Sequence, residues 1–356
     1  MKIKSLTVKN FRNLAPQKIE FSDGLNVLFG KNAQGKTNTI EAIYCSTIGR
    51  SPKTRRDGEM IAFNHGGLEV LLNYEHKQIE RVIKLEISHS QKSVFVDDTK
   101  LKKLSDVIGN FGSVYFSPEE LSLTKNGPGF RRRFMDIINC QLSKNYLSNL
   151  QRFQKLLNQR NALLKQPNLT YAEIEVWDRQ LIAVGAKIFD ERKKFCEKLS
   201  CVASTVHKKL TNENEQLEIV YQSELNSENT AEEYLNSLAK NFDKERILGY
   251  TTFGLQNDDF LIKLNKRDLK KVGSQGQHRT VTLSLKLAEL EILKEEYGEY
   301  PVLLLDDVLS ELDQTRRQKL CEYIMKVQCI LTCTEFDLPL SCQKYLVDGG
   351  VVTKIE

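Results

Sequence analysis

The segment Gly30–Thr37 constrains the fold of this chain more than any other segment. It follows the apolar run Leu25–Phe29, which predicts a short buried strand, and residues 37–48 predict a helix directly after it. Glycines permit positive φ and close backbone approach, so N–H groups can converge, and a helix N-terminus adds partial positive charge. The pattern therefore predicts an α/β fold with a phosphate-binding loop of Gly30, Lys31, Asn32, Ala33, Gln34, Gly35, Lys36 and Thr37.

Two carboxylates complete the predicted phosphate site. Lys36 is expected to reach the β- and γ-phosphates of a nucleotide, and Thr37 to hold Mg²⁺. Asp306 follows four apolar residues, 302–305, and so should emerge at the C-terminal end of a buried strand, where open α/β sheets bind ligands. Asp306 is the expected Mg²⁺ carboxylate, and Asp307 is the candidate to polarise the attacking water. A pair of capping aspartates after a strand is the alternative interpretation.

The composition is that of a folded protein without a membrane span. Of 356 residues, 28% are charged and 40% hydrophobic, and the net charge of +5 permits a nucleic-acid or membrane-surface partner without requiring one. No run of 18 apolar residues and no signal-peptide pattern occurs. The eight cysteines include no CxxC pair, which disfavours zinc and disulfides and predicts reduced thiols in the cytoplasm.

The chain changes character twice, which predicts three segments. Residues 1–124 are β-rich with one strong helix, residues 125–246 are helical, and residues 247–356 return to an α/β pattern. Two amphipathic runs in the middle segment break near Gln166–Asn168, which predicts an antiparallel coiled-coil arm. Helices of about 25 residues would make this arm roughly 35–40 Å long. A compact helical bundle is the alternative, and residues 212–230 are expected to be a loop.

Two further motifs lie before and after the strand that leads into Asp306. Gly273-Ser-Gln-Gly-Gln277 precedes an expected helix at residues 278–297, and Ser310-Glu-Leu-Asp313 follows Asp306. In this order, the string 273–277, the strand that ends at Asp306 and the segment 310–313 resemble the signature motif, the Walker B motif and the D-loop of the ABC-type ATPases. The resemblance implies an ATP-dependent homodimer in which Ser274, Gly276 and Gln277 of one subunit close over phosphates held by the partner's loop, with Ser310 and Asp313 as D-loop residues.

The long insertion between the phosphate loop and Ser274 resembles the SMC-like branch, not transporters. The opening Leu6–Asn13 is also similar to that branch and implies that Arg12 lies near the nucleotide. A short arm without a hinge or zinc hook resembles the RecF family in particular. The supporting stretches are Gly35–Tyr44, Gly49–Ser51, Phe116–Thr124, Phe130–Phe134 and Leu303–Asp313.

This resemblance implies an ATPase head with an inserted helical arm, slow ATP hydrolysis that resets a DNA clamp, and a RecR-like mediator protein as partner. It also implies a role in DNA repair, replication and the SOS response. Asp307 stands where transporters have glutamate, which fits slow hydrolysis. The switch histidine has no clear counterpart, so Thr332 or Thr334 is expected near the γ-phosphate, and Ser117–Leu121 is the expected Q-loop region.

DNA binding rests mainly on the resemblance. Three basic clusters could contact phosphates without reading sequence, although each could equally be a solvated charged face. They are Lys53, Arg55 and Arg56; Arg131, Arg132 and Arg133; and Lys100, Lys102 and Lys103. The DNA is expected to be double-stranded or a single/double-strand junction. A nucleotide-gated protein-interaction module without a direct grip on DNA remains the alternative function.

Overall fold

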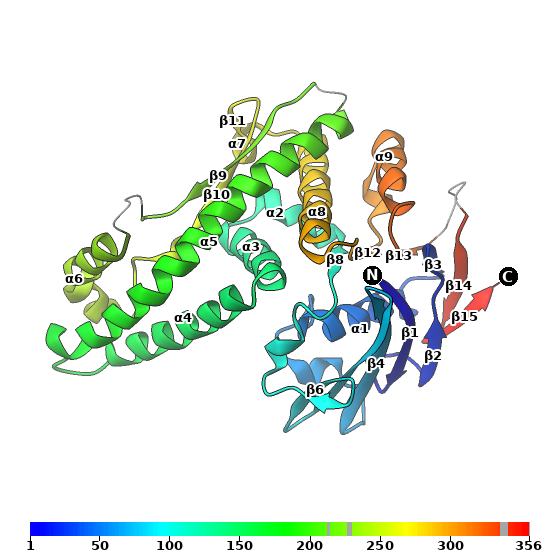
Figure 1. Ribbon diagram of the computed structural model, residues 1–356, viewed down its shortest axis with the longest axis horizontal. Coiled ribbons are helices and arrows are strands. Elements are labelled where there is room, and N and C mark those ends of the chain that lie inside the picture. Colours follow the sequence, from blue (N-terminus) through cyan, green and yellow to red (C-terminus); the bar gives the residue numbers. More distant parts are fainter. Residues whose placement is uncertain (212–213, 226–229, 335–340, 356) are drawn as a thin grey trace. The chain divides into compact units, whose positions relative to one another are not determined.

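The computed structural model describes residues 1–211, 214–225, 230–334 and 341–355 (Figure 1). The chain forms two compact units, a head made of Met1–Leu121 and Gln275–Glu356 and an arm made of Ser122–Ser274. The first boundary lies close to the expected 124/125. The second lies well beyond the expected 246/247, because β10 (Asp259–Leu264) pairs along its length with β9 (Leu217–Gln222) and so belongs to the arm.

One sheet of the head is antiparallel. Its strand order is β2-β1-β4-β5-β6-β7, and strand burial alternates, as in β4, so one face packs inward and the other is exposed. β1 pairs in antiparallel fashion with β2 at the edge of this sheet. The bounds are β1 Lys2–Lys9, β2 Gln17–Glu20, β4 Gly67–His76, β5 Ile79–Ser88, β6 Lys92–Val96 and β7 Thr99–Lys100.

The second sheet of the head carries the motif strands. Its order is β15-β14-β3-β13-β12-β8, and only β15 runs antiparallel to its neighbour. β12 is buried throughout, which fits its continuous apolar run. The bounds are β3 Leu25–Phe29, β8 Ser113–Phe116, β12 Val302–Asp306, β13 Cys329–Cys333, β14 Gln343–Asp348 and β15 Val351–Ile355.

Helix α1 (Lys36–Ile48) lies in the core of the head. It contacts β4 and β5 of the first sheet and β12 and β13 of the second, and most of its side chains are buried. Helix α8 (Gln275–Tyr297) begins three residues before the expected start at 278, so the motif residues 275–277 form its first turn. The remaining head helices are α9 (Gln314–Ile324) and the 3-10 turns η1 Asp57–Met60, η2 Leu104–Val107, η3 Pro118–Leu121 and η5 Leu309–Glu311.

The arm contains the expected antiparallel pair. Helix α4 (Lys144–Leu163) packs against α5 (Tyr171–Thr211), the long green helix of Figure 1. At 41 residues α5 is about 60 Å long, so the expected 35–40 Å was too short. The other elements are α2 Ser122–Lys125, α3 Pro128–Leu142, α6 Thr230–Leu248, η4 Leu255–Asn257, β11 Arg267–Asp268 and α7 Leu269–Val272.

The expectation of a loop at residues 212–230 was wrong in part. β9 occupies 217–222 and packs against α5, while 212–213 and 226–229 lie outside the described residues. The strand is only six residues long and polar segments flank it, so its short apolar pattern was not recognised as a strand. No helix in the described ranges is long and apolar enough to cross a membrane.

Buried ion pairs hold the arm together. Arg160 of α4 is fully buried and donates to Asp178 of α5 at 2.5 Å and to Glu245 of α6 at 2.5 Å. Arg192 of α5 pairs with Asp136 of α3 and with Asp258 in the same way. Asp178 and Arg192 lie inside a seam otherwise made of Ile174, Leu181, Ile188 and Phe195. Buried charges at such positions favour one register, because any slip would leave them unpaired.

Candidate nucleotide-binding site

The phosphate loop between β3 and α1 has the backbone that its sequence predicts. Gly30, Ala33 and Gly35 have φ values of 148°, 65° and 118°, and Gly35 is also the N-cap of α1. A Cβ on Gly30 would lie 2.4 Å from the carbonyl oxygen of Val347, so no larger residue fits there. A loop of this shape at a helix N-terminus presents converging N–H groups and suits a phosphate.

Lys36 folds back over this loop. Its Nζ donates to the carbonyl oxygens of Gly30 at 2.6 Å and of Lys31 at 2.8 Å. Burial lowers the pKa of the Lys36 amine, although the nearby Asp307 acts in the opposite direction. The amine therefore lies at the mouth of the loop, where a cation could meet terminal phosphates.

Asp306 joins the second motif to the first. Its Oδ1 accepts hydrogen bonds from Thr37 Oγ1 at 2.7 Å and from Thr332 Oγ1 at 2.8 Å. Its Oδ2 accepts from Tyr115 at 3.2 Å and lies 3.9 Å from Lys53 Nζ. Residues 269 positions apart in sequence thus meet, as the motifs predict.

The donor set fits magnesium. A threonine hydroxyl and a carboxylate are hard oxygen ligands, and Mg²⁺ usually takes one or two such ligands together with phosphate oxygens and water. No group of three or more His, Cys, Asp or Glu side chains that could hold a metal occurs in the part of the chain described. The Thr37–Asp306 pair suits a metal that arrives with a nucleotide.

Thr332 and Tyr115 both donate to Asp306, and the sequence pointed to only the first of them. Thr332 and Thr334 were both candidates, and Thr332 is the one on Asp306, whereas Thr334 is exposed. Tyr115 was missed. β8 lies beside β12 in parallel, and only this strand pairing brings Tyr115 to the carboxylate. Burial and the Asp306 carboxylate raise the pKa of Tyr115, so its hydroxyl stays a donor.

Asp307 has an unusual backbone. Its φ is 52°, and its N–H donates to Thr332 Oγ1 at 3.0 Å. Burial raises the pKa of its carboxyl and the adjacent Asp306 adds to this, while Ser310 opposes it. Ser310 Oγ also donates to the Asp307 carbonyl oxygen at 2.8 Å, which ties the D-loop to the end of β12. A carboxyl with a raised pKa next to Asp306 suits the base predicted from sequence.

Arg12 is bonded to helix α1, and its expected place near the nucleotide stays a prediction. Its guanidinium makes a bidentate pair with the buried Glu41 of α1, at 2.5 and 2.7 Å, and donates to the Glu59 carbonyl oxygen. Its neighbour Asn13 contacts the phosphate loop instead, donating to the Ala33 carbonyl oxygen at 3.0 Å. The expected motif thus supports the loop through Asn13, a residue not assigned from sequence.

The start of α8 is tied to the D-loop segment within the head. Arg279 donates to Glu311 at 2.8 Å, and Arg316 donates to Thr280 at 2.5 Å and pairs with Asp313. Thr280 in turn donates to the Gly276 carbonyl oxygen. Ser274, directly before α8, is exposed. The action of Ser274, Gly276 and Gln277 on a partner's nucleotide remains a prediction.

One basic cluster was assigned wrongly in part. Arg131 is buried and donates to both carboxylate oxygens of Asp259, at 2.6 and 2.8 Å, and to two backbone carbonyl oxygens. Its guanidinium is therefore engaged within the arm and, in this structure, does not face solvent as the predicted DNA contact would. Arg132 is half-buried and donates to the Asp258 carbonyl oxygen, whereas Arg133 is exposed.

The basic loop after α1, residues 50–56, remains open to a large partner. Arg50, Arg55 and Arg56 are exposed, and Arg56 pairs only loosely with Glu59 at 3.8 Å. Phe63 follows on the next turn with 90% of its surface exposed. Exposed cations can contact nucleic-acid phosphates, and an exposed aromatic ring can stack on a base.

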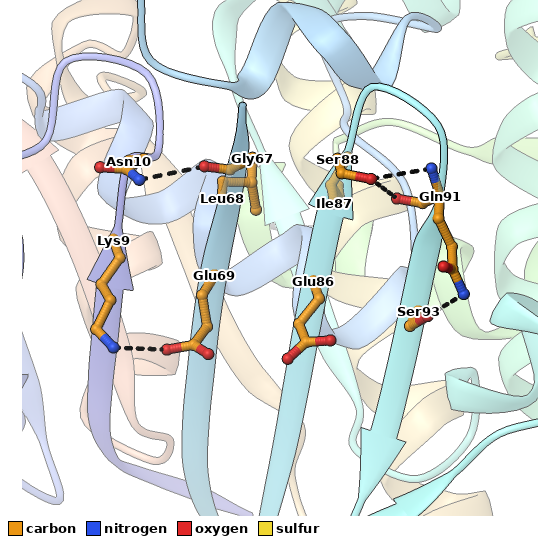
Figure 2. A pocket seen from close by; sticks show the side chains of 10 residues that line it. All are labelled: Lys9, Asn10, Gly67, Leu68, Glu69, Glu86, Ile87, Ser88, Gln91 and Ser93. Atoms are coloured by element: carbon orange, nitrogen blue, oxygen red, sulfur yellow. Dashed lines mark hydrogen bonds and ion pairs between the residues drawn. The ribbon is translucent and has the colours of Figure 1, made fainter. Parts of the chain in front are cut away.

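A groove of about 360 Å³ lies elsewhere on the head, on the exposed face of the antiparallel sheet (Figure 2). Lys9 pairs with Glu69 at 3.1 Å, and Lys84 bridges Glu69 and Glu86. These charges neutralise one another, and none of residues 30–37 lines the groove. The groove is therefore separate from the phosphate site.

Comparison with known proteins identifies the family of this site. Residues 2–338 match the family model described as "RecF/RecN/SMC N terminal domain". The chain is 39% identical over its whole length to the DNA replication and repair protein RecF of Clostridium tetani, covering 98% of that protein. It is 40% identical to the RecF of Clostridium novyi, with the same two coverages.

The chain belongs to the RecF family. A solved structure described as "the recombination mediator protein RecF-ATP in RecFOR pathway" is 34% identical, with a TM-score of 0.94 over 99% of this chain and 97% of that one. An Smc head bound to the C-terminal winged-helix domain of ScpA matches with a TM-score of 0.58 at 15% identity over 99% and 96% of the chains. That second likeness extends the fold, though not the function, from the RecF family to SMC heads.

Proposed function

We propose that this RecF-family chain is a weak ATPase that uses ATP and Mg²⁺ to switch its grip on DNA. The observation that carries the proposal is the hydrogen bond between Thr37 Oγ1 and Asp306 Oδ1, beside a loop shaped for phosphate. The RecF structure described with ATP supports ATP as the nucleotide.

In this proposal each residue of the site has a separate task. The N–H groups of residues 30–35 and the amine of Lys36 bind the phosphates and neutralise their charge. Thr37 and Asp306 hold Mg²⁺, which when bound supplies charge stabilisation to the β- and γ-phosphates. Asp307 accepts a proton from the attacking water, and Thr332 orients Asp306 and Asp307 together.

The switch operates through a homodimer. Ser274 and the first turn of α8 bind the γ-phosphate on the partner subunit, since a helix N-terminus with an exposed hydroxyl suits an anion. The bonds from Arg279 and Arg316 couple that turn to the D-loop. ATP then joins two heads, and slow hydrolysis at Asp307 releases them and resets the clamp.

DNA binds mainly through its backbone. The exposed Arg55 and Arg56, together with Lys53 and Arg133, contact phosphates of a duplex or a single/double-strand junction. A RecR-like mediator protein is the expected protein partner. The wording "RecFOR pathway" for the relative supports that assignment.

Molar mass in solution tests this function. Light scattering should report a monomer without nucleotide and a dimer with ATP and Mg²⁺. Ser274→Arg should bind ATP and stay monomeric, because a bulky cation blocks the helix end. A wild-type chain that binds ATP yet stays monomeric, with or without DNA, would overturn the switch.

The second candidate function is a nucleotide-gated protein-interaction module without a direct grip on DNA. The pairing of Arg131 with Asp259 favours this function, because it removes one arginine from a basic cluster that DNA could contact. Arg55→Glu with Arg56→Glu separates the two functions. A large loss of DNA affinity at low salt, with a shallower salt dependence than wild type, supports the DNA clamp, whereas unchanged affinity supports the module. Lys208→Glu with Lys209→Glu, exposed on α5, is the matched control.

A further inference from the structure

The turn between β14 and β15 presses against the outside of the phosphate loop. Gly349 and Gly350 form this two-residue turn, with φ values of 53° and 82°, as a type I′ hairpin requires. Gly350 N–H donates to the Gln34 carbonyl oxygen at 3.0 Å, and Gly349 N–H donates to Gln34 Oε1 at 2.7 Å. One residue of the phosphate loop is thus held at both its backbone and its side chain.

The same turn is anchored on its other side. The Gly350 carbonyl oxygen accepts from Ala15 N–H at 3.0 Å and from Gln17 Nε2 at 2.7 Å. The approach is so close that a Cβ on Gly350 would lie 2.0 Å from the Asn13 carbonyl oxygen. Asn13 itself donates to Ala33 in the phosphate loop. The turn, the segment 13–17 and the loop therefore form one hydrogen-bonded layer.

We propose that the Gly349–Gly350 turn is a clamp that sets the phosphate loop in its binding conformation before ATP arrives, with Gly350 and Gln34 as positioning residues. This inference rests on the proposed function, since it concerns the ATP affinity of the same loop. Gln34 accepts both turn N–H groups, one at its backbone carbonyl oxygen and one at Oε1. Holding donors in place before binding removes an ordering cost from the affinity.

The two glycines provide a matched pair of variants. Gly350→Ala would drive a Cβ into the Asn13 carbonyl oxygen, so the turn must shift away from the loop. Gly349→Ala introduces the same side chain at a similar positive φ in the same turn, yet nothing lies within 4 Å of its Cβ. Both variants strain the hairpin, and only the first disturbs the clamp.

Two measurements on the full-length chain test this inference. The first is hydrogen exchange in the absence of nucleotide, read from the peptide that covers residues 30–37. The second is ATP affinity, measured by titration calorimetry. Gly350→Ala should speed exchange in that peptide and weaken ATP binding about tenfold. Gly349→Ala should change both by less than about twofold. Equal effects of the two variants, or none from Gly350→Ala, overturn the inference.

A second route avoids any risk of misfolding. Gln34 is only partly buried, and Gln34→Met keeps its length while removing the acceptor for Gly349 N–H. Its effect on ATP affinity should overlap with that of Gly350→Ala, so the double variant should lose less than the product of the single losses. If the losses of ATP affinity in the double variant multiply fully, the proposed role of the Gly349–Gly350 turn is contradicted. If the wild type fails to bind ATP, the proposed function fails, and the exchange experiment without nucleotide still tests the clamp alone.

Discussion

Lys53 Nζ lies 3.9 Å from Asp306 Oδ2, so a residue of the exposed basic loop reaches the carboxylate proposed to hold Mg²⁺. The Lys53 side chain remains about one-third exposed, whereas the Asp306 side chain is almost buried. The basic loop and the nucleotide site are therefore electrostatically linked. Lys53 had been predicted only as a DNA contact.

Removing this cation should favour the metal. In Lys53→Ala, Mg²⁺ no longer competes with an ammonium group for Asp306, so the Mg²⁺ concentration for half-maximal ATPase should fall about twofold to threefold, as suits a weak exposed pair. A magnesium titration of ATPase rate measures this. Lys102→Ala, in an exposed cluster, is the control, and an unchanged Mg²⁺ requirement in Lys53→Ala would contradict the link.

Lys36→Met should abolish ATP binding, with a loss of roughly a hundredfold or more in affinity, because a buried cation is removed from the phosphates. Lys31→Met tests whether any cation in the loop would suffice, since Lys31 is exposed in the same segment. Calorimetric titration with ATP compares the two. Similar losses in both variants would mean that general positive charge, not the position of Lys36, determines binding.

Hydrolysis should fail in acid earlier than an ordinary aspartate would allow. Because the pKa of Asp307 is raised, its carboxyl takes up a proton above the usual value of about 3.9, and the ATPase rate should decline as pH falls through that raised pKa. Asp307→Asn should retain ATP binding and lose hydrolysis. A pH–rate profile with an acidic limb at or below the ordinary value would count against Asp307 as the base.

The raised pKa of Asp307 also makes the free energy of unfolding depend on pH. The folded state binds the Asp307 proton more tightly than the unfolded state, so ionising this group lowers stability as pH rises through the raised pKa. Asp307→Asn should therefore unfold at higher denaturant than wild type at neutral pH, with no difference below about pH 4. Denaturant midpoints at both pH values measure this.

The buried pair in the arm should matter far more than an exposed one. Arg160→Ala leaves Asp178 and Glu245 buried without their cation and should cost about 3–5 kcal/mol of unfolding free energy. Arg179→Ala removes an exposed pair with Glu175 on the same arm and should cost less than about 1 kcal/mol. Denaturant unfolding compares them, and equal midpoints would refute the structural role of Arg160.

Site residues that belong to motifs contiguous in sequence could be predicted, whereas a residue brought in by strand pairing could not. The phosphate loop and Thr37 were predictable because strand, glycine spacing and helix follow one another in sequence. Asp306 was predictable because an apolar strand precedes it directly, and its contact with Thr37 is confirmed. Tyr115 could not be found this way, since only the pairing of β8 with β12 brings it to Asp306.

Charge patterns were less reliable than motifs. Arg131 belongs to a run of three arginines that predicts either DNA phosphate contacts or a solvated face, yet Arg131 is buried and pairs with Asp259, far along the sequence. The length of α5 was also underestimated, because its buried face continues through Ala203, Val206 and Leu210. Asp178 and Arg192 interrupt its apolar seam and become compatible with burial only through partners on other elements.

The strand order of the second sheet has a consequence for synthesis on the ribosome. β3, which leads into the phosphate loop, lies between β13 and β14, and Gln34 bonds to a residue 315 positions later. The nascent loop therefore waits for the last strands to emerge before its sheet can close, and contacts of such sequence separation form slowly. A chain released early would display its most diagnostic motif in full and yet lack the neighbours that shape it.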